Sequence, residues 1–136
     1  MQDVVKSLPV STLAYIGDAY YELQIREMLL ANHLTASGKL HILAIPYVRA
    51  EGQAAFLHNL QDKLTEVERN VVRRARNHRP HSMPKHADPV TYRYATAFEA
   101  LIGYLHLSGQ DQRITDLLKD LFVGDEDYET KEQEKS

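Results

Sequence analysis

Apolar residues recur at helical spacing along most of the chain. Between residues 11 and 31 they follow the i, i+3, i+7 spacing of one buried helical stripe, which further apolar residues widen. Ser7 or Ser11 is suited to cap the start of this helix, and Pro9 suits its first turn or the approach to it. The stripe consists of Leu13, Ile16, Tyr20 and Leu23, and it is widened by Tyr21, Ile25 and Met28.

The middle of the chain predicts two further helical regions. Residues 37–60 have a helical pattern, which Pro46 should divide into two helices or kink. Thr65 and Glu68 form a T-x-x-E capping box, which predicts a helix that continues to about residue 76.

Two more helices are predicted over residues 91–107 and 110–122, and no alternating strand pattern persists for more than a few residues. The fold class is therefore all-α. The chain of 136 residues is long enough for one domain, which we place at residues 1–123. Residues 124–136 contain six acids and too few apolar side chains to fold alone, so they predict a disordered acidic tail.

The charge of the chain is distributed unevenly. The tail contributes −4 to a net charge of −3, so the first 123 residues carry +1. Residues 69–86 contain six Lys or Arg, three His and no acid, and they lead into a Pro-rich stretch at residues 77–88. This stretch predicts a long basic loop suited to a polyanion.

The composition also limits the choice of cofactor and compartment. The chain has no cysteine, which excludes disulfides and thiolate metal sites. It shows no signal peptide and no apolar run of the length that a membrane span needs, so we expect a soluble, cytoplasmic protein. His78, His81 and His86 lack the spacing typical of a zinc site, and phosphate contact or simple exposure is the better interpretation.

Two helices each place one carboxylate beside one glycine. LAYIGDAYYEL contains Gly17 and Asp18, and TAFEALIGYLHL contains Glu99 with Gly103 one turn later. A glycine lets another backbone approach closely, so the two acids would point into one narrow junction. Such a pair repels unless it shares a proton or holds a cation, and oxygen ligands favour Mg²⁺. With the basic loop, this pair indicates a phosphodiesterase that acts on nucleic acid.

Simpler interpretations exist for each of these residues. Asp18 could be a partly exposed acid paired with an arginine, and the two glycines could serve helix packing only. Glu22 lies one turn from Asp18, but an ion pair with Arg26 explains it equally well.

At these motifs the sequence resembles a known family. LAYIGDAYYEL is similar to the signature of the ribonuclease III catalytic domain, and TAFEALIGYLHL resembles its second motif. Three further segments resemble the Mini-ribonuclease III subgroup, which lacks a double-stranded RNA-binding domain. They are KLHILAIPYVRAEGQAAFL, VVRRARN and PKHADPVTYRYATAFEALIGYL.

The resemblance implies an all-helical domain, a symmetric homodimer and Mg²⁺-dependent cleavage of double-stranded RNA, with Mn²⁺ as a substitute. The products would carry 5′-phosphate and 3′-hydroxyl ends. It also implies a role in maturation of large-subunit (23S) ribosomal RNA, with a ribosomal protein as helper in some cases. A two-fold dimer suits this substrate, because a duplex presents two antiparallel strands.

The same resemblance assigns the site. Asp18 and Glu99 are the implied catalytic and metal-binding acids. Where the wider family has two more acids, this chain has Ala14 and Thr96. Further metal ligands would then come from water, phosphate oxygens or another acid, for which Glu22, Glu51 and Asp88 are candidates.

A duplex-specific enzyme recognises the shape and phosphate spacing of A-form RNA, so basic residues near the loop are the expected contacts. They are Arg73, Arg74, Arg76, Arg79 and Lys85. Because two acids are absent, a non-catalytic dimeric RNA-binding or ribosome-assembly module on the same fold is an alternative, and a nuclease for DNA or single strands is a third possibility.

Overall fold

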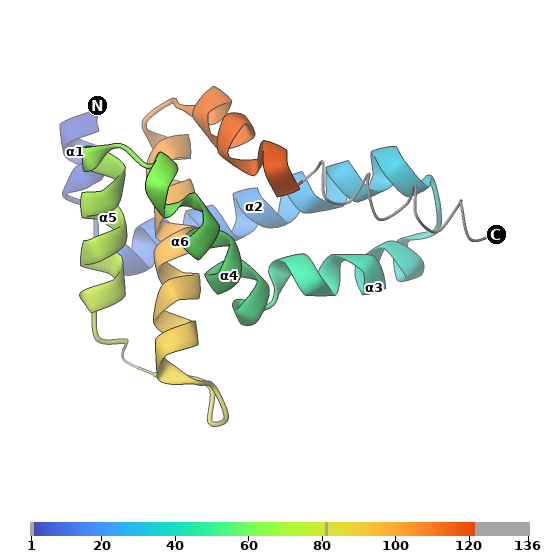
Figure 1. Cartoon of the computed structure of the whole chain (residues 1–136), viewed down its shortest axis with the longest axis horizontal. Helices are drawn as coiled ribbons and strands as arrows, with labels where there is room; N and C mark the ends of the chain where they lie inside the picture. Colours follow the sequence, from blue (N-terminus) through green and yellow to red (C-terminus); the bar gives the residue numbers. More distant parts are fainter. Residues whose placement is uncertain (1, 81, 122–136) are drawn as a thin grey trace.

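The structure is a computed structural model that describes residues 2–80 and 82–121. Within these residues the chain forms helices and no strands, which confirms the predicted all-α class (Figure 1). The predicted acidic tail and His81 lie outside the described residues. The elements are α1 (Gln2–Lys6), α2 (Val10–His33), α3 (Ser37–Val48), α4 (Ala50–Leu60), the 3₁₀ helix η1 (Gln61–Lys63), α5 (Glu66–Asn77) and α6 (Pro89–Leu107), followed by helical residues 111–121.

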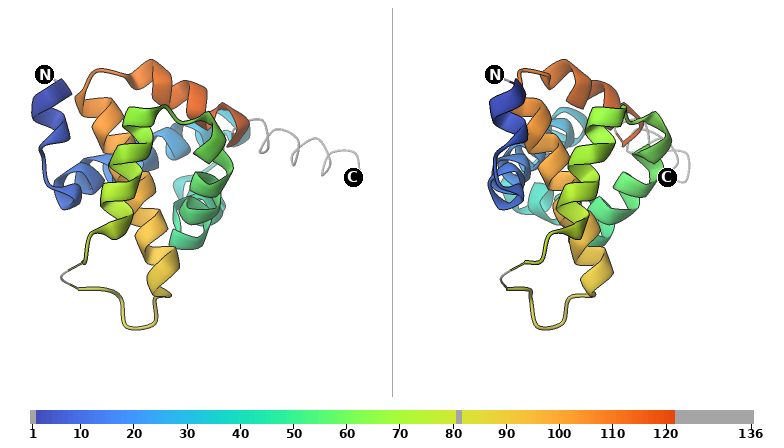
Figure 2. Two further views of the ribbon diagram at one scale, coloured as in Figure 1. Left: turned by 60° about the vertical axis from the view of Figure 1, so that its left-hand side comes forward. Right: turned by 90° about the vertical axis from the view of Figure 1, so that its left-hand side faces the viewer.

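Helix α6 is the centre of the fold. In the right-hand view of Figure 2 it runs between α2 on one side and α4 and α5 on the other, and all three pack against it. Phe98 of α6 is fully buried, and its ring lies edge-on to Tyr21 at 4.9 Å and to Phe56 at 5.9 Å. Edge-on aromatic pairs add roughly 0.5–1.5 kcal/mol to the burial of their area, so this trio ties α2 and α4 to α6.

Helices α2 and α6 cross with their backbones in contact. A Cβ atom on Gly17 would lie 1.7 Å from the carbonyl oxygen of Glu99, and one on Gly103 would lie 1.8 Å from that of Leu13. These distances confirm that each glycine lets the opposite backbone approach. No other residue type fits at either position without moving a helix.

The crossing also selects the buried face of α2. The prediction was right in part: Tyr21, Ile25 and Met28 are buried, but the stripe through Ile16, Tyr20 and Leu23 is not the buried one. The buried residues follow i, i+4 spacing through Leu13, Gly17, Tyr21 and Ile25, whereas Leu23 is 50% exposed. Helix α2 has apolar residues on two adjacent faces, so periodicity alone does not choose between them. The face that carries Gly17 is buried because only that face can approach α6.

The capping predictions had mixed outcomes. The Thr65 capping box is present, with the Glu68 amide 3.2 Å from Thr65 Oγ1 and the Thr65 amide 2.9 Å from Glu68 Oε1. The prediction that Ser7 or Ser11 caps α2 was wrong, because Pro9 occupies the cap position without a side-chain bond. The Ser7 hydroxyl donates instead to the Val4 carbonyl at 2.7 Å.

The region around Pro46 forms two helices, but Pro46 lies inside α3 and the break comes at Arg49, whose backbone is extended. Gly52 of α4 faces this turn, because a Cβ there would lie 2.0 Å from the Pro46 carbonyl oxygen. The break between the two helices therefore comes three residues beyond the proline.

The predicted basic loop joins α5 to α6 and extends below both helices in Figure 1. It ends at Asp88, whose carboxylate caps α6 by accepting bonds from the Thr91 amide at 3.1 Å and the Thr91 hydroxyl at 2.8 Å. These bonds hold the pKa of Asp88 below its ordinary value. None of the helices in the described part of the chain has the length and apolarity to span a membrane.

Candidate active site

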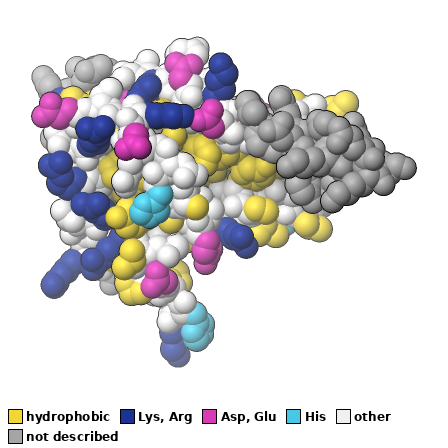
Figure 3. Space-filling view, viewed as in Figure 1, with side chains coloured by type: hydrophobic (Ala, Val, Ile, Leu, Met, Phe, Trp, Pro, Cys, Tyr) yellow, Lys and Arg dark blue, Asp and Glu magenta, His cyan; other side chains and the backbone are white. Residues whose placement is uncertain are grey.

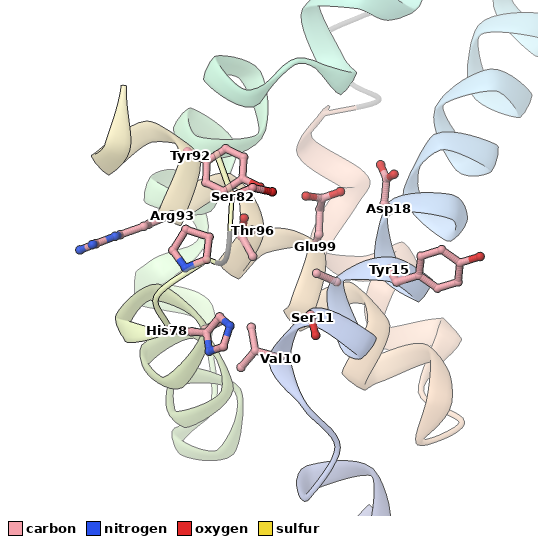
Figure 4. Close-up of a pocket in the computed structure, with 13 residues that line it drawn as sticks. Val10, Ser11, Tyr15, Asp18, His78, Ser82, Tyr92, Arg93, Thr96 and Glu99 are labelled. Carbon is pink, nitrogen blue, oxygen red and sulfur yellow. The ribbon is translucent and has the colours of Figure 1, made fainter. Parts of the chain in front are cut away.

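A cavity of about 390 Å³ opens where α2, the end of α5, the following loop and α6 meet. Figure 4 shows Asp18 and Glu99 with neighbouring carboxylates at this junction, with Tyr15 projecting away from them. The lining residues are Val10, Ser11, Ala14, Tyr15, Asp18, Ala75, His78, Pro80, Ser82, Tyr92, Arg93, Thr96 and Glu99.

The helical repeat explains why α2 and α6 each supply one wall. On α2, Ser11, Ala14 and Asp18 have i, i+3, i+7 spacing and so share one face. On α6, Tyr92, Thr96 and Glu99 share a face in the same way. The Gly17–Gly103 crossing holds these two faces together. The structure therefore brings together the two acids that the sequence predicted to meet.

The electrostatics of the pair follow from this closeness. Glu99 is half-buried, and its burial raises its pKa to about 9, with further contributions from a hydrogen bond to Asp18 and from the Asp18 charge. Asp18 lies on the exposed side. In the absence of a cation the pair therefore shares one proton at neutral pH, which the protonated Glu99 carboxyl donates to Asp18.

The donor set fits a hard divalent cation. Asp18 and Glu99 offer carboxylate oxygens, which suit Mg²⁺, and their mutual repulsion is what a cation would relieve. Over residues 2–80 and 82–121 no cluster of three or more acidic or histidine side chains could hold a metal ion. Protein ligands from the described residues would thus be these two acids, with water or substrate oxygens completing the shell.

The other candidate acids lie elsewhere. Glu22 pairs with Arg26 at 2.9 Å, as the simpler interpretation expected. Glu51 lies in the first turn of α4, Asp88 caps α6, and none of the three lines the cavity. Ala14 and Thr96, the two positions without the family's acids, both line it. Their side chains are short and uncharged, so they leave space beside the carboxylates.

Sequence reasoning missed several polar residues of the cavity. Tyr92, Arg93 and Ser11 lie on α6 and α2, and Ser82 lies within the basic loop. His78, considered from the sequence for phosphate contact, lies directly after α5. Helical spacing from Thr96 and Asp18 could have identified the residues on the helices. No sequence signal could have shown that the loop folds back against the site.

The five basic residues predicted to bind RNA are not in the cavity. The Arg74 guanidinium donates to the carbonyl groups of Lys6 and of Leu8, the latter at 3.0 Å, and so holds the N-terminal segment. Arg76 lies 5.8 Å from the centre of the Tyr94 ring. Arg73 bonds Asn70 at 3.3 Å, and Arg79 and Lys85 are exposed on the loop.

The helical fold and the acid pair at a glycine crossing define the class of protein. Residues 11–110 match the Ribonuclease III domain family. A crystal structure of a Fusobacterium nucleatum protein is similar at a TM-score of 0.80 and 26% identity, with 89% of this chain and 97% of that chain covered. The chain belongs to the ribonuclease III family.

Curated relatives make the assignment narrower. The chain is 50% identical to the Mini-ribonuclease 3 of Symbiobacterium thermophilum, with 83% of this chain and 87% of the relative covered. It is 47% identical to the Mini-ribonuclease 3 of Brevibacillus brevis, with 82% and 83% covered. The chain is thus a member of the Mini-ribonuclease 3 group and an endoribonuclease of the ribonuclease III type.

Proposed function

We propose that this chain hydrolyses double-stranded RNA in a Mg²⁺-dependent reaction and leaves 5′-phosphate and 3′-hydroxyl ends. The observation that carries the proposal is the Asp18–Glu99 pair, held by a glycine crossing beside a cavity of about 390 Å³. An acid with a pKa of about 9 is costly to keep beside another acid, and metal binding is a role that explains its presence.

Asp18 and Glu99 are the residues that would hold the cation. A divalent ion bound there supplies a Lewis acid for the phosphodiester and lowers the pKa of a bound water, and Mn²⁺ could replace Mg²⁺. Glu99 must release its proton when it becomes a ligand, so binding is favoured as pH rises. Arg93 extends outward at the edge of the cavity in Figure 4, where its guanidinium suits a phosphate of the bound strand.

A symmetric homodimer is part of the proposal, because one chain offers one site and a duplex has two strands to cut. Helix α2 supports it with an apolar stripe on its exposed side. Tyr15 is 78% exposed, Leu23 50%, Leu30 48% and Leu34 81%. An exposed stripe of this size is typical of a protein interface. Tyr15 lies one turn from Asp18, so a second copy seated on the stripe would stand beside the active site.

Of the five basic residues expected to bind RNA, we assign only the two on the loop, Arg79 and Lys85, to the duplex that is cut, because Arg73 and Arg76 line a separate hollow. Arg79 and Lys85 are exposed on the segment that also places His78 and Ser82 at the cavity. Their charges would contact backbone phosphates, which set the register of a duplex without reading its bases.

The proposed biological substrate is precursor large-subunit (23S) ribosomal RNA in the cytoplasm, with a ribosomal protein as a candidate helper. Support comes from the resemblance to the Mini-ribonuclease group. The lack of cysteine fits a reducing compartment.

The test is cleavage of a long RNA duplex in the presence of Mg²⁺ by the wild type and by two variants, Asp18→Asn and Glu99→Gln. Glu22→Gln is the matched control, since it removes one acid of α2 that lies outside the cavity. We expect cleavage by the wild type and Glu22→Gln, none without metal, and none by the two site variants. End-labelling the products would identify the 5′-phosphate.

Other outcomes would decide against the proposal. An inactive wild type that still binds duplex RNA would favour the non-catalytic assembly module, and equal activity of all variants would remove Asp18 and Glu99 from the mechanism. Preferential cleavage of DNA or single-stranded RNA would refute the substrate class.

A further inference from the structure

A second hollow, of about 290 Å³, lies between η1 and α5. Three arginines line it, Arg69, Arg73 and Arg76, together with Gln61 and Asp62 among other residues. Among the ion pairs of the described residues none involves these arginines. Figure 3 shows Lys and Arg side chains along the left-hand edge of the molecule, which is where α5 lies in Figure 1. The hollow therefore carries a net positive charge, because three arginines line it against the single carboxylate of Asp62.

This hollow lies on a different side of α5 from the active-site cavity. Residues two apart on a helix point about 200° apart. Ala75 of α5 lines the active-site cavity, and Arg73 lines the second hollow. On α6, Tyr92 and Thr96 line the cavity, and Tyr94 lies between them in sequence and points to the opposite side. The arginines are thus not part of the wall that holds the scissile phosphate.

Aromatic rings continue the basic surface. The Arg76 guanidinium lies 5.8 Å from the Tyr94 ring centre, and the His58 ring of α4 lies 4.4 Å from the same ring, tilted by 34°. His58 is exposed and Tyr94 is half-buried, so the ring pair reaches the surface. Arg76 belongs both to the hollow and to this stack, which joins the two features. We call the set of Arg69, Arg73, Arg76, Tyr94 and His58 the α5 surface.

We propose that the α5 surface binds an unpaired RNA segment that continues from the duplex being cut. Closely spaced arginines beside stackable rings are what proteins use for single strands, because the backbone supplies phosphates and each base has a free face. Bases inside a duplex are stacked on one another and could not use His58 or Tyr94. The inference rests on the proposed function, which makes RNA the substrate.

The test compares two RNAs in fluorescence anisotropy without divalent metal, so that neither is cut. One is a blunt duplex, and the other is the same duplex with a single-stranded oligoadenosine extension. The variants are Arg69→Gln with Arg73→Gln, and separately His58→Ala. Lys39→Gln with Lys119→Gln is the matched control, because it removes two exposed charges from α3 and from the last helical stretch.

We expect the wild type to bind the extended RNA more tightly than the blunt duplex. Loss of Arg69 and Arg73 should remove this advantage. It should also reduce the magnitude of the slope of log affinity against log salt concentration by about 1.4, since each phosphate contact to a single strand contributes about 0.7. His58→Ala should weaken binding of the extended RNA by roughly fivefold or more. Binding and Mg²⁺-dependent cleavage of the blunt duplex should stay unchanged in all of these variants, and the lysine control should match the wild type.

Three results would overturn the inference: no advantage of the extension in the wild type, an equal loss for both RNAs when Arg69 and Arg73 are replaced, or the same loss in the lysine control. Cleavage of the blunt duplex by the wild type separates this failure from failure of the proposed function. If the blunt duplex is cut but the extension adds nothing, only the α5 surface is refuted.

Discussion

The stability of the metal-free protein should depend on pH through Glu99. Burial and Asp18 together raise the pKa of Glu99 from 4.5 to about 9. Between these values the folded chain retains a proton that the unfolded chain has released. Folding is therefore coupled to proton uptake at Glu99, and the stability that depends on this group is greatest at low pH and is lost as pH rises toward 9. Glu99→Gln keeps the shape of the side chain and removes this proton equilibrium.

The magnitude follows from the linkage. Each pH unit in that interval lowers the free energy of unfolding by about 1.4 kcal/mol, so an increase from about pH 5 to about pH 8 costs the wild type at most about 4 kcal/mol. Glu99→Gln avoids this loss. In a domain of this size the difference corresponds to at most about 15 °C in Tm. The variant should resemble the wild type near pH 5 and exceed it by that amount near pH 8.

The assay is thermal unfolding followed by circular dichroism in EDTA across this pH range, repeated with Mg²⁺. A ligand that binds only the folded chain raises its stability, so Mg²⁺ should raise the Tm of the wild type near pH 8 and have little effect on Glu99→Gln. Asp18→Asn should also reduce the pH dependence, because it removes the Asp18 charge that helps raise the Glu99 pKa.

The control is Glu22→Gln, which removes an exposed acid paired with Arg26 on the same helix as Asp18. It should retain the pH profile of the wild type. Parallel profiles of wild type and Glu99→Gln in EDTA would refute the reasoning, because Glu99 would then titrate alike in the folded and unfolded chains.

Other predictions concern packing and assembly. Gly17→Ala should abolish folding or lower the free energy of unfolding by at least about 3 kcal/mol in a urea titration, because its Cβ would lie 1.7 Å from the Glu99 carbonyl oxygen. Gly38→Ala is the control and should be tolerated, because a Cβ there meets nothing within 4 Å. Glu68→Gln breaks a buried pair with Arg113, whose guanidinium binds both carboxylate oxygens at 2.9 Å, and should lower stability by roughly 2–4 kcal/mol near pH 7. Burial raises the pKa of Glu68, but the bonds from Arg113 and Thr65 outweigh burial and lower it. The stability that the pair contributes is therefore present above the unfolded-state pKa of 4.5 and is lost as pH falls through the folded-state value. A difference in stability between wild type and variant that stays unchanged in acid would contradict this prediction. Leu23→Asp should convert a dimer into a folded monomer by light scattering, and a wild type that is already monomeric would refute the proposed interface.

The sequence predicted those features that rest on local chemistry. The Thr65 capping box, the all-helical pattern and the close approach at Gly17 and Gly103 each follow from a few neighbouring residues. It failed where tertiary contacts decide. Leu23 and Tyr21 both fit an amphipathic helix, and only the crossing with α6 determines that Tyr21 is the buried one.

The candidate site divides in the same way. Asp18 and Glu99 were recognisable because acids in apolar helices are unusual. Arg93 and Ser82 were not, since an arginine on a helix and a serine in a loop carry no signal until the fold places them at a common cavity. The orientation of α5 likewise decides which of its arginines line the second hollow and which one, Arg74, holds the N-terminal segment.

The two positions without the family's acids bear on how the metal-free chain can fold. Ala14 and Thr96 line the same cavity as Asp18 and Glu99. Two facing carboxylates can be relieved by one shared proton, as the raised pKa of Glu99 indicates. Four acids in the same space would need several protons or a bound cation. Because the lining of this cavity has only two, the glycine crossing can close without metal, and the proposed metal would serve the chemistry rather than the fold.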